Sequence, residues 1–142
     1  MLELVVNRGV PGSGKSTFAR KWVLADVRRA RVNRDDIRMQ LYGQEFGGIV
    51  DERAVTRVEH AMIRALLEVG ISVIVDDCNI SQKYITAFTK IGNEFDAVVS
   101  VNTVEVSLGT ALERNRMRRD EGGRFVPENV IVDMYNKMHG VS

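Results

Sequence analysis

The sequence predicts an α/β fold in which a four-stranded parallel sheet is flanked by helices on both faces. Short apolar runs rich in β-branched residues alternate along the chain with longer runs of helical periodicity, as in successive βαβ units. The run at residues 72–76 is apolar and ends in an acid, which is typical of a buried parallel strand. Because ligands of such sheets bind at the carboxyl ends of the strands, the segments after the strands hold the candidate functional residues.

Each element has its own signal in the residue pattern. Asn33 or Asp35 can cap the helix that follows the second strand. Gly70 ends the longest helix, and Pro127 suits the first turn of the last one. The predicted strands span residues 2–8, 29–33, 72–76 and 97–104, and the predicted helices span residues 16–25, 35–42, 51–69, 82–94, 107–119 and 127–139.

Two of these helices also show which side faces the core. The first helix is expected to turn Phe18, Trp22 and Val23 inward. The longest helix has an apolar face made up of Val55, Val58, Met62, Ala65, Leu66 and Val69. Glycines at positions 43, 47 and 48 indicate a flexible loop before it.

Composition restricts the class of protein. The chain has 142 residues, 44% of them hydrophobic, and no break in composition, which predicts a single domain over residues 1–142. The net charge of +1 gives no overall field that would mark a nucleic-acid binder, although a local basic patch would suffice for one. Cys78 is the only cysteine, which suits a reducing compartment such as the cytoplasm. No apolar run is long enough for a membrane helix, so no membrane is expected among its partners.

The loop after the first strand carries the strongest motif. Residues 9–17 read GVPGSGKST, which fits the G-x-x-x-x-G-K-S pattern of a phosphate-binding P-loop between a strand and a helix. Its glycines let backbone N–H groups converge on an anion, and the following helix points its positive end at the same place. Lys15 adds a full charge for the outer phosphates, and the Ser16 hydroxyl can ligate Mg²⁺. The expected nucleotide-binding residues are Gly12, Ser13, Gly14, Lys15, Ser16 and Thr17.

The second strand is followed by Asp35 and Arg38, which share a face at the head of a helix. The carboxylate could accept a proton from an attacking hydroxyl, and the guanidinium could hold an anionic part of the acceptor. The same spacing also suits a helix cap with a surface ion pair, so the residues alone leave both interpretations open.

The third strand is followed by Asp76 and Asp77. An acid at this position in a P-loop protein binds Mg²⁺ directly, through water, or by orienting Ser16. The alternative is an aspartate that caps a turn. The residue pattern does not decide between the two acids.

The densest basic segment lies near the carboxyl end of the chain. It has five arginines within eleven positions, namely Arg114, Arg116, Arg118, Arg119 and Arg124. Arg114 and Arg118 lie one turn apart on one helix face, and Gly122 and Gly123 follow. Such a segment suits a lid that closes on phosphates, and the alternative is a solvated basic face.

Taken in order, these motifs resemble the kinase domain of phage-type polynucleotide 5′-kinases. The resemblance runs from GVPGSGKST through Asn33-Arg34-Asp35-Asp36-x-Arg38, then Asp77-x-Asn79, then Arg114-Asn115-x-x-Arg118, to Val126-Pro127. It covers residues 2 to about 138, and the second and fourth of these segments are more specific than the P-loop. No D-x-D-x-T phosphatase motif, often joined to this domain in the family, is present.

On the nucleotide side, the resemblance implies that Lys15 and Ser16 bind the β- and γ-phosphates of ATP and the metal. Arg118 would be the lid arginine on the donor phosphates, with Arg114 supporting nucleotide binding. Asp77 matches the acid at the strand end and would lie on the metal side, a choice over Asp76 that comes from the resemblance alone.

On the acceptor side, the resemblance implies that Asp35 is the general base on a 5′-hydroxyl. Arg38 would hold the phosphate on the 3′ side of that hydroxyl, and Asp77 and Asn79 would complete the substrate site. The catalytic residues would be Lys15, Asp35, Arg38 and Arg118.

The expected activity is therefore transfer of the ATP γ-phosphoryl group to the 5′-OH end of single-stranded or end-exposed DNA or RNA, with Mg²⁺. One alternative is a P-loop kinase that phosphorylates a hydroxyl of a metabolite or antibiotic. Another is a nucleotide-binding switch with no acceptor, although the absence of an N-K-x-D motif counts against a GTPase. The sequence leaves the oligomeric state open, with a homo-oligomer among the alternatives.

Overall fold

The structure is a computed structural model that describes residues 1–44 and 48–140. Its elements are β1 (Glu3–Arg8), α1 (Lys15–Leu24), β2 (Arg29–Val32), α2 (Arg34–Tyr42), α3 (Glu52–Glu68), β3 (Ser72–Val75), α4 (Gln82–Glu94), β4 (Val98–Thr103), α5 (Leu108–Asp120) and α6 (Glu128–Met138). Every predicted helix and strand is present. The predicted glycine loop falls partly on residues 45–47, which lie outside the described residues.

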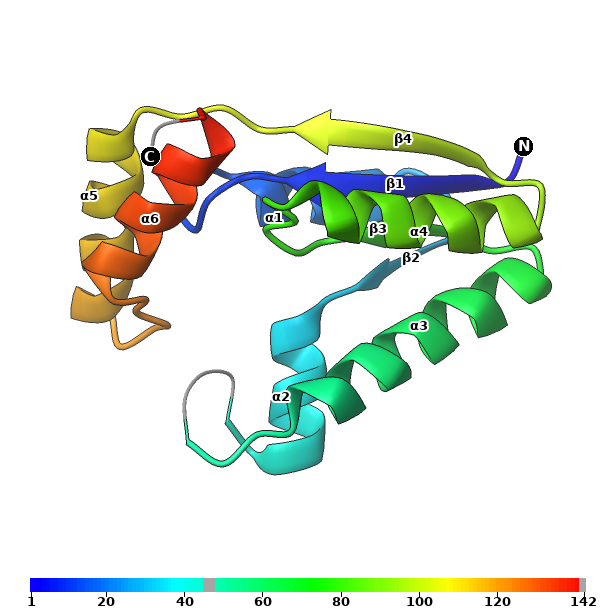
Figure 1. Cartoon of the computed structure of the whole chain (residues 1–142), viewed down its shortest axis with the longest axis horizontal. Helices are drawn as coiled ribbons and strands as arrows, with labels where there is room; N and C mark the ends of the chain where they lie inside the picture. The colour runs from blue at the N-terminus through cyan, green and yellow to red at the C-terminus, as the bar shows by residue number, and fades with distance from the viewer. Residues whose placement is uncertain (45–47, 141–142) are drawn as a thin grey trace.

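The sheet is parallel throughout, and its strands lie in the order β2-β3-β1-β4. In the centre, Leu4 of β1 lies beside Val73 of β3 on one side and Val99 of β4 on the other. All strands therefore end at the same edge of the sheet. Figure 1 shows α5 and α6 beyond this edge, with α2 on the same side of the molecule.

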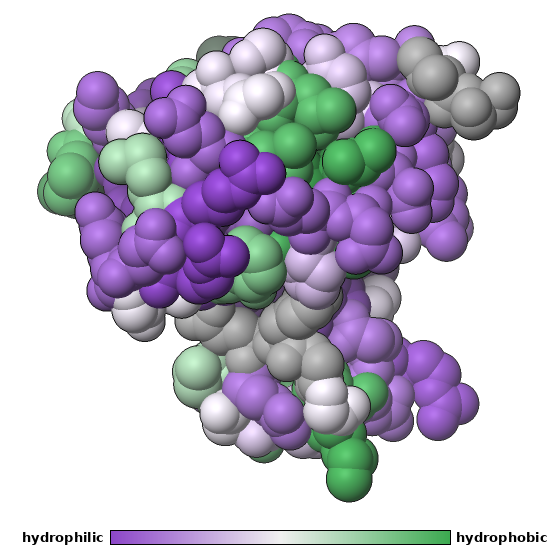
Figure 2. All heavy atoms as spheres, turned by 90° about the vertical axis from the view of Figure 1, so that its left-hand side faces the viewer, coloured by the Kyte–Doolittle hydropathy of each residue, from purple (hydrophilic) through white to green (hydrophobic). Residues whose placement is uncertain are grey.

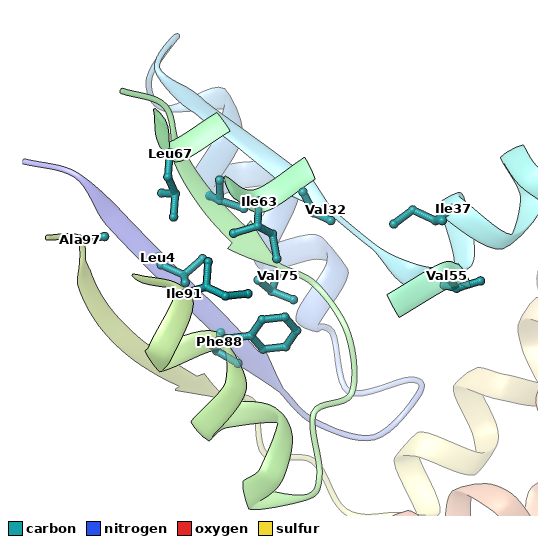
Figure 3. Close-up of a cluster of buried hydrophobic side chains, with 12 residues drawn as sticks. Leu4, Val32, Ile37, Val55, Ile63, Leu67, Val75, Phe88, Ile91 and Ala97 are labelled. Carbon is teal, nitrogen blue, oxygen red and sulfur yellow. The ribbon is translucent and has the colours of Figure 1, made fainter. Parts of the chain in front are cut away.

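Helices cover both faces of the sheet. On one face α3 and α4 enclose the largest core, in which Leu4 and Val75 meet Ile63, Phe88 and Ile91 (Figure 3). On the other face α1 packs through Ala19 and the partly buried Trp22 and Val23 onto Val5 and Ile74. The predicted fold class is confirmed.

A third core joins α5 and α6 to the P-loop. Ala111 of α5, Ile131 of α6 and Val126 of the connecting loop are buried together with Val10. We call residues 108–127, α5 and the loop after it, the lid. Its attachment to Val10 fixes the base of the lid against the P-loop.

The predicted buried faces need two corrections. Phe18 is 40% exposed, and Ala19 is the fully buried residue of α1. On α3 the buried residues are Val55, Glu59, Ile63 and Leu67, whereas Met62, Ala65 and Val69 are exposed. The apolar pattern misses the true face of α3 because one member of that face is a carboxylate.

Within residues 1–44 and 48–140, no helix combines the length and the apolar character needed to cross a membrane.

Candidate active site

At two positions the P-loop backbone has a conformation that only glycine adopts easily. Gly12 and Gly14 have φ angles of +83° and +98°. A Cβ on Gly12 would also lie 2.7 Å from the carbonyl oxygen of Ala111, so the lid helix packs against the loop at this point. The glycines therefore serve both the backbone turn and the contact with α5.

The beginning of α1 is open to an anion. Gly14 is the N-cap of α1 and has no side chain that could accept a hydrogen bond. The first backbone N–H groups of the helix therefore have no capping acceptor. The Ser13 hydroxyl is buried and has no hydrogen-bond partner among the described residues. Lys15, Ser16 and Thr17 form the first turn. Unpaired donors that converge at a helix N-terminus make a site for phosphate.

Asp76 is the strand-end acid that lies against the P-loop helix. Its Oδ1 accepts a hydrogen bond of 3.0 Å from Asn7 Nδ2, which also donates to the carbonyl oxygen of Lys15 at 2.8 Å. Its Oδ2 accepts a 2.6 Å hydrogen bond from Arg31. Asp76 is fully buried, and this network connects it to the turn that carries Lys15 and Ser16.

Asp77 faces away from this network, toward α2 and α3. Its Oδ1 accepts a 2.9 Å hydrogen bond from the backbone N–H of Arg34, at the start of α2. Burial raises the pKa of Asp77, and Glu59 of α3 is its hydrogen-bonding neighbour. The metal-side role expected for Asp77 stays a prediction, and its contacts place it beside α2.

Glu59 is a buried acid that the sequence did not single out. It is 1% exposed, and burial, followed by the charge of Asp77, raises the pKa of Glu59 to about 10. Arg34 Nη1 lies 3.5 Å from Glu59 Oε1. The raised pKa favours the protonated form of Glu59 at neutral pH, and the contacts of Glu59 and Asp77 join α3 to the N-terminus of α2.

Asp35 and Arg38 meet as the sequence predicts. Arg38 Nη1 donates to Asp35 Oδ1 at 2.7 Å, and both side chains are largely buried. Arg38 Nε donates to the two oxygens of Glu52 at 3.1 and 2.9 Å. These hydrogen bonds raise the pKa of Arg38 and lower the pKa of Glu52. The structure thus adds Glu52 of α3 to the predicted pair.

The lid reaches both sides of the site. Arg114 Nη1 donates to the carbonyl oxygen of Gly12 at 3.1 Å, and Arg124 Nη1 donates to Asp35 Oδ2. The loop after α5, which carries Arg124, is held by Asn115 of α5, whose side-chain amide donates to the Val126 carbonyl at 2.8 Å and accepts from the Val126 N–H at 3.0 Å.

The remaining lid arginines differ in surroundings. Arg116 pairs with Glu128 at the start of α6 at 2.6 Å, and Arg119 lies over the ring of Phe125 within the lid. Burial and the charge of Arg124 lower the pKa of Arg118, which still stays charged at neutral pH. Figure 2 views the strand-end face of the molecule, where hydrophilic side chains predominate.

Asn79 is buried, and its contacts are structural. It has a φ of +48°, and its amide donates to the carbonyl oxygen of Asn7 at 2.7 Å. This bond fixes the segment after β3 to the end of β1. The substrate contact expected for Asn79 stays a prediction.

Sequence reasoning missed Asn7, Glu52 and Glu59 and gave Arg124 no separate role. Glu59 had one usable signal, because it is a carboxylate within the apolar rows of a long helix. Asn7 and Glu52 had none, since polar residues at a strand end and in a first helical turn are common.

The parallel sheet, the P-loop and the basic lid define a P-loop nucleotide-binding protein. A family model described as "AAA domain" matches residues 4–140. The chain belongs to this AAA domain family.

Two similar proteins bear on the class within this family. The chain is 26% identical over 132 residues to the "Putative bifunctional polynucleotide kinase/RNA ligase" of Autographa californica nuclear polyhedrosis virus, a match that covers 84% of this chain and 18% of the viral protein. It is 28% identical, with a TM-score of 0.86, to a chain in the "Structure of the Pnkp1/Rnl/Hen1 RNA repair complex", over 98% of this chain and 44% of that one. These matches confirm the resemblance to polynucleotide kinases. The chain spans less than half the length of either relative.

The fold is also found among small-molecule kinases. A gluconokinase from Sinorhizobium meliloti is 20% identical, with a TM-score of 0.58 over 95% of this chain and 74% of the gluconokinase. This likeness concerns the fold alone.

Proposed function

We propose that this chain transfers the γ-phosphoryl group of ATP to the 5′-hydroxyl end of a polynucleotide. One observation carries the proposal: the lid contacts the P-loop through Arg114 and the Asp35–Arg38 pair through Arg124. A single element thus spans a phosphate-binding loop and a carboxylate paired with arginine. Phosphoryl transfer requires such a donor site and acceptor site side by side, because its catalysis depends mainly on positioning and charge.

On the donor side, the P-loop amides and Lys15 would bind the β- and γ-phosphates of ATP. Arg114 is in contact with the loop. Arg118 is partly buried, and a charge that is partly shielded from water would attract phosphates more strongly. Both would neutralise charge on the transferring group.

The residues also suit Mg²⁺. Among the described residues no group of three or more His, Cys, Asp or Glu side chains gathers, so the ion would depend on a hydroxyl, one acid and the phosphates. Such a set of oxygen ligands is the one Mg²⁺ prefers. Ser16 is the hydroxyl, and Asp76 is a better candidate acid than Asp77 because it is joined through Asn7 to the turn of Ser16. When bound, the ion would offset negative charge on the β- and γ-phosphates.

On the acceptor side, Asp35 would accept the proton of the 5′-hydroxyl as its oxygen attacks the γ-phosphorus. Arg38 would hold the phosphate on the 3′ side of that hydroxyl, since a guanidinium binds phosphate through two parallel N–H groups. Glu52 would keep the guanidinium plane oriented through its two hydrogen bonds. Because the names of both relatives refer to RNA, RNA ends are the favoured acceptors.

The test is transfer of labelled γ-phosphate from ATP to a single-stranded RNA with a 5′-OH, beside the same RNA with a 5′-phosphate. We expect label on the first RNA alone. A matched DNA and a panel of sugars and nucleosides complete the experiment. Label on a sugar or nucleoside and none on either 5′-OH strand would replace the proposal with a small-molecule kinase. Slow hydrolysis without any labelled acceptor would favour a nucleotide-binding switch.

A further inference from the structure

Asp35 is engaged by arginine at both of its oxygens. Oδ1 accepts from Arg38 of α2, and Oδ2 accepts from Arg124, which lies 89 residues away in the sequence on the loop after α5. A hydroxyl that is to give its proton to Asp35 must therefore approach an oxygen that already accepts a hydrogen bond from a guanidinium. The residue expected to act as the base is covered in the absence of substrate.

The two arginines reach Asp35 from different kinds of segment. Arg38 stands on a helix, and Glu52 holds its guanidinium through hydrogen bonds to both carboxylate oxygens. Arg124 stands on a loop that is fastened on both sides of it, by the Gly123 N–H to the Arg118 carbonyl at 2.7 Å and by the Asn115–Val126 pair. Because Arg124 reaches Asp35 from a loop and not from a helix, a rotamer change of its side chain would break this contact without moving a helix.

A phosphate near the acceptor hydroxyl would compete for Arg124. The Arg124–Asp35 pair is only partly buried, with side-chain exposures of 29% and 17%, so an incoming phosphate can reach it. Guanidinium groups form charge-assisted, often bidentate contacts with phosphate as they do with carboxylate, so a phosphate can compete with Asp35 for Arg124. Water brings no such charge and leaves the pair closed.

We infer that Arg124 is a specificity-determining residue that frees Asp35 for a phosphate-bearing acceptor and withholds it from water. This inference rests on the proposed function. In transfer, the acceptor oxygen bonds to the γ-phosphorus, Asp35 takes its proton, and the bond to the β,γ-bridging oxygen breaks to release ADP. In the competing reaction the attacking oxygen comes from water, and the products are ADP and inorganic phosphate. Coupling base availability to the correct substrate is a form of induced fit.

The experiment measures ATP hydrolysis by the full chain in the absence of any acceptor. Arg124→Gln removes the charge and keeps a polar side chain of moderate length. We expect its hydrolysis rate to rise about three- to tenfold, the range for loss of one partly buried ion pair, with KM for ATP unchanged. Arg124→Lys keeps the charge and should stay within about twofold of the wild-type rate. Arg116→Gln removes another arginine–carboxylate pair, between the lid and Glu128 of α6, and should leave hydrolysis unchanged.

Three results would overturn the inference. Equal hydrolysis by Arg124→Gln and the wild type, including no detectable hydrolysis by either, would show that Arg124 does not restrain the reaction with water. A raised KM for ATP in Arg124→Gln would make Arg124 a donor-phosphate residue. A rise in Arg124→Lys as large as that in Arg124→Gln would show that charge at this position is irrelevant. Arg124→Met, which also removes the charge, replaces the Gln variant if that variant does not fold. Because no acceptor is present, these outcomes do not depend on whether 5′-OH strands are labelled.

Discussion

The donor side and the acceptor side of the candidate site are built from different kinds of contact. The donor side is made mainly of backbone, with Gly12 and Gly14 at positive φ and a helix that begins without a side-chain cap. The acceptor side is made of side chains from three separate segments, α2, α3 and the lid, joined by ion pairs around Asp35 and Arg38. Backbone geometry therefore sets the shape of the donor side, and ion pairs between residues far apart in sequence set the arrangement of the acceptor side.

This difference predicts how each side responds to mutation. On the donor side, we expect a methyl group added to a P-loop glycine to change the path of the backbone, so that several contacts with phosphate are lost together. On the acceptor side, loss of one charge leaves the backbone in place and shifts affinity in graded steps.

Apart from loss of the proposed base, the largest effect is expected on the donor side. Gly12→Ala adds a Cβ at a φ of +83° and 2.7 Å from the Ala111 carbonyl, so either the P-loop or the lid must shift. We expect ATP binding to weaken by ~100-fold, from strain and displacement together. Calorimetric titration with ATP measures this. Gly109→Ala is the matched control, because a Cβ there meets no atom within 4 Å, and its ATP affinity should be unchanged.

On the acceptor side, Arg38→Ala has the largest expected effect apart from loss of the base. It removes a charge that lies between Asp35 and Glu52. The acceptor KM should rise by ~10- to 100-fold, while the affinity for ATP stays the same. Steady-state kinetics with a 5′-OH RNA test this, with Arg64→Ala, which breaks a surface pair with Glu94, as control. An equal loss with acceptors that lack the adjacent phosphate would contradict the role of Arg38.

A smaller effect is expected from Glu52→Gln. The amide keeps one acceptor atom for Arg38 but loses the charge and the second carboxylate oxygen. The acceptor KM should rise by ~3-fold, with kcat little changed, because an exposed ion pair contributes modestly. A change as large as that of Arg38→Ala would mean that Glu52 itself contacts the substrate.

Glu59→Gln is expected to change the pH dependence of stability rather than activity at neutral pH. The folded chain keeps the Glu59 proton up to a pKa of about 10, while the unfolded chain releases it near 4.5. The free energy of unfolding of the wild type should therefore fall as pH rises through this interval, by at most ~1.4 kcal/mol per pH unit from this group. Glu59→Gln removes that contribution.

Urea unfolding at pH 7 and pH 9 measures the difference between the two proteins. The wild type should lose more stability than Glu59→Gln over this range. Parallel losses in both would show that the proton is not held by Glu59.

The same contrast explains what the sequence could predict. The P-loop, the alternation of strands and helices along the chain and the Asp35–Arg38 pair depend on residues close in sequence. The structure has all three where the sequence predicts them. Glu52 and Arg124 meet Asp35 and Arg38 only after the chain has folded back from α3 and the lid, so no local pattern marks them. The buried face of α3 was misplaced for the same reason, since Glu59 lies on it beside Asp77 and Arg34, which belong to other segments.

The measurement that tests the separation of the two sides most directly uses Asp35→Asn. This variant preserves the size of the side chain and removes the group proposed to accept the proton. We predict that ATP affinity stays within ~2-fold of the wild type while phosphoryl transfer to a 5′-OH RNA falls by ~10²- to 10⁴-fold. Transfer at the wild-type rate would remove Asp35 as the base, and a parallel loss of ATP affinity would contradict the separation of donor and acceptor sides.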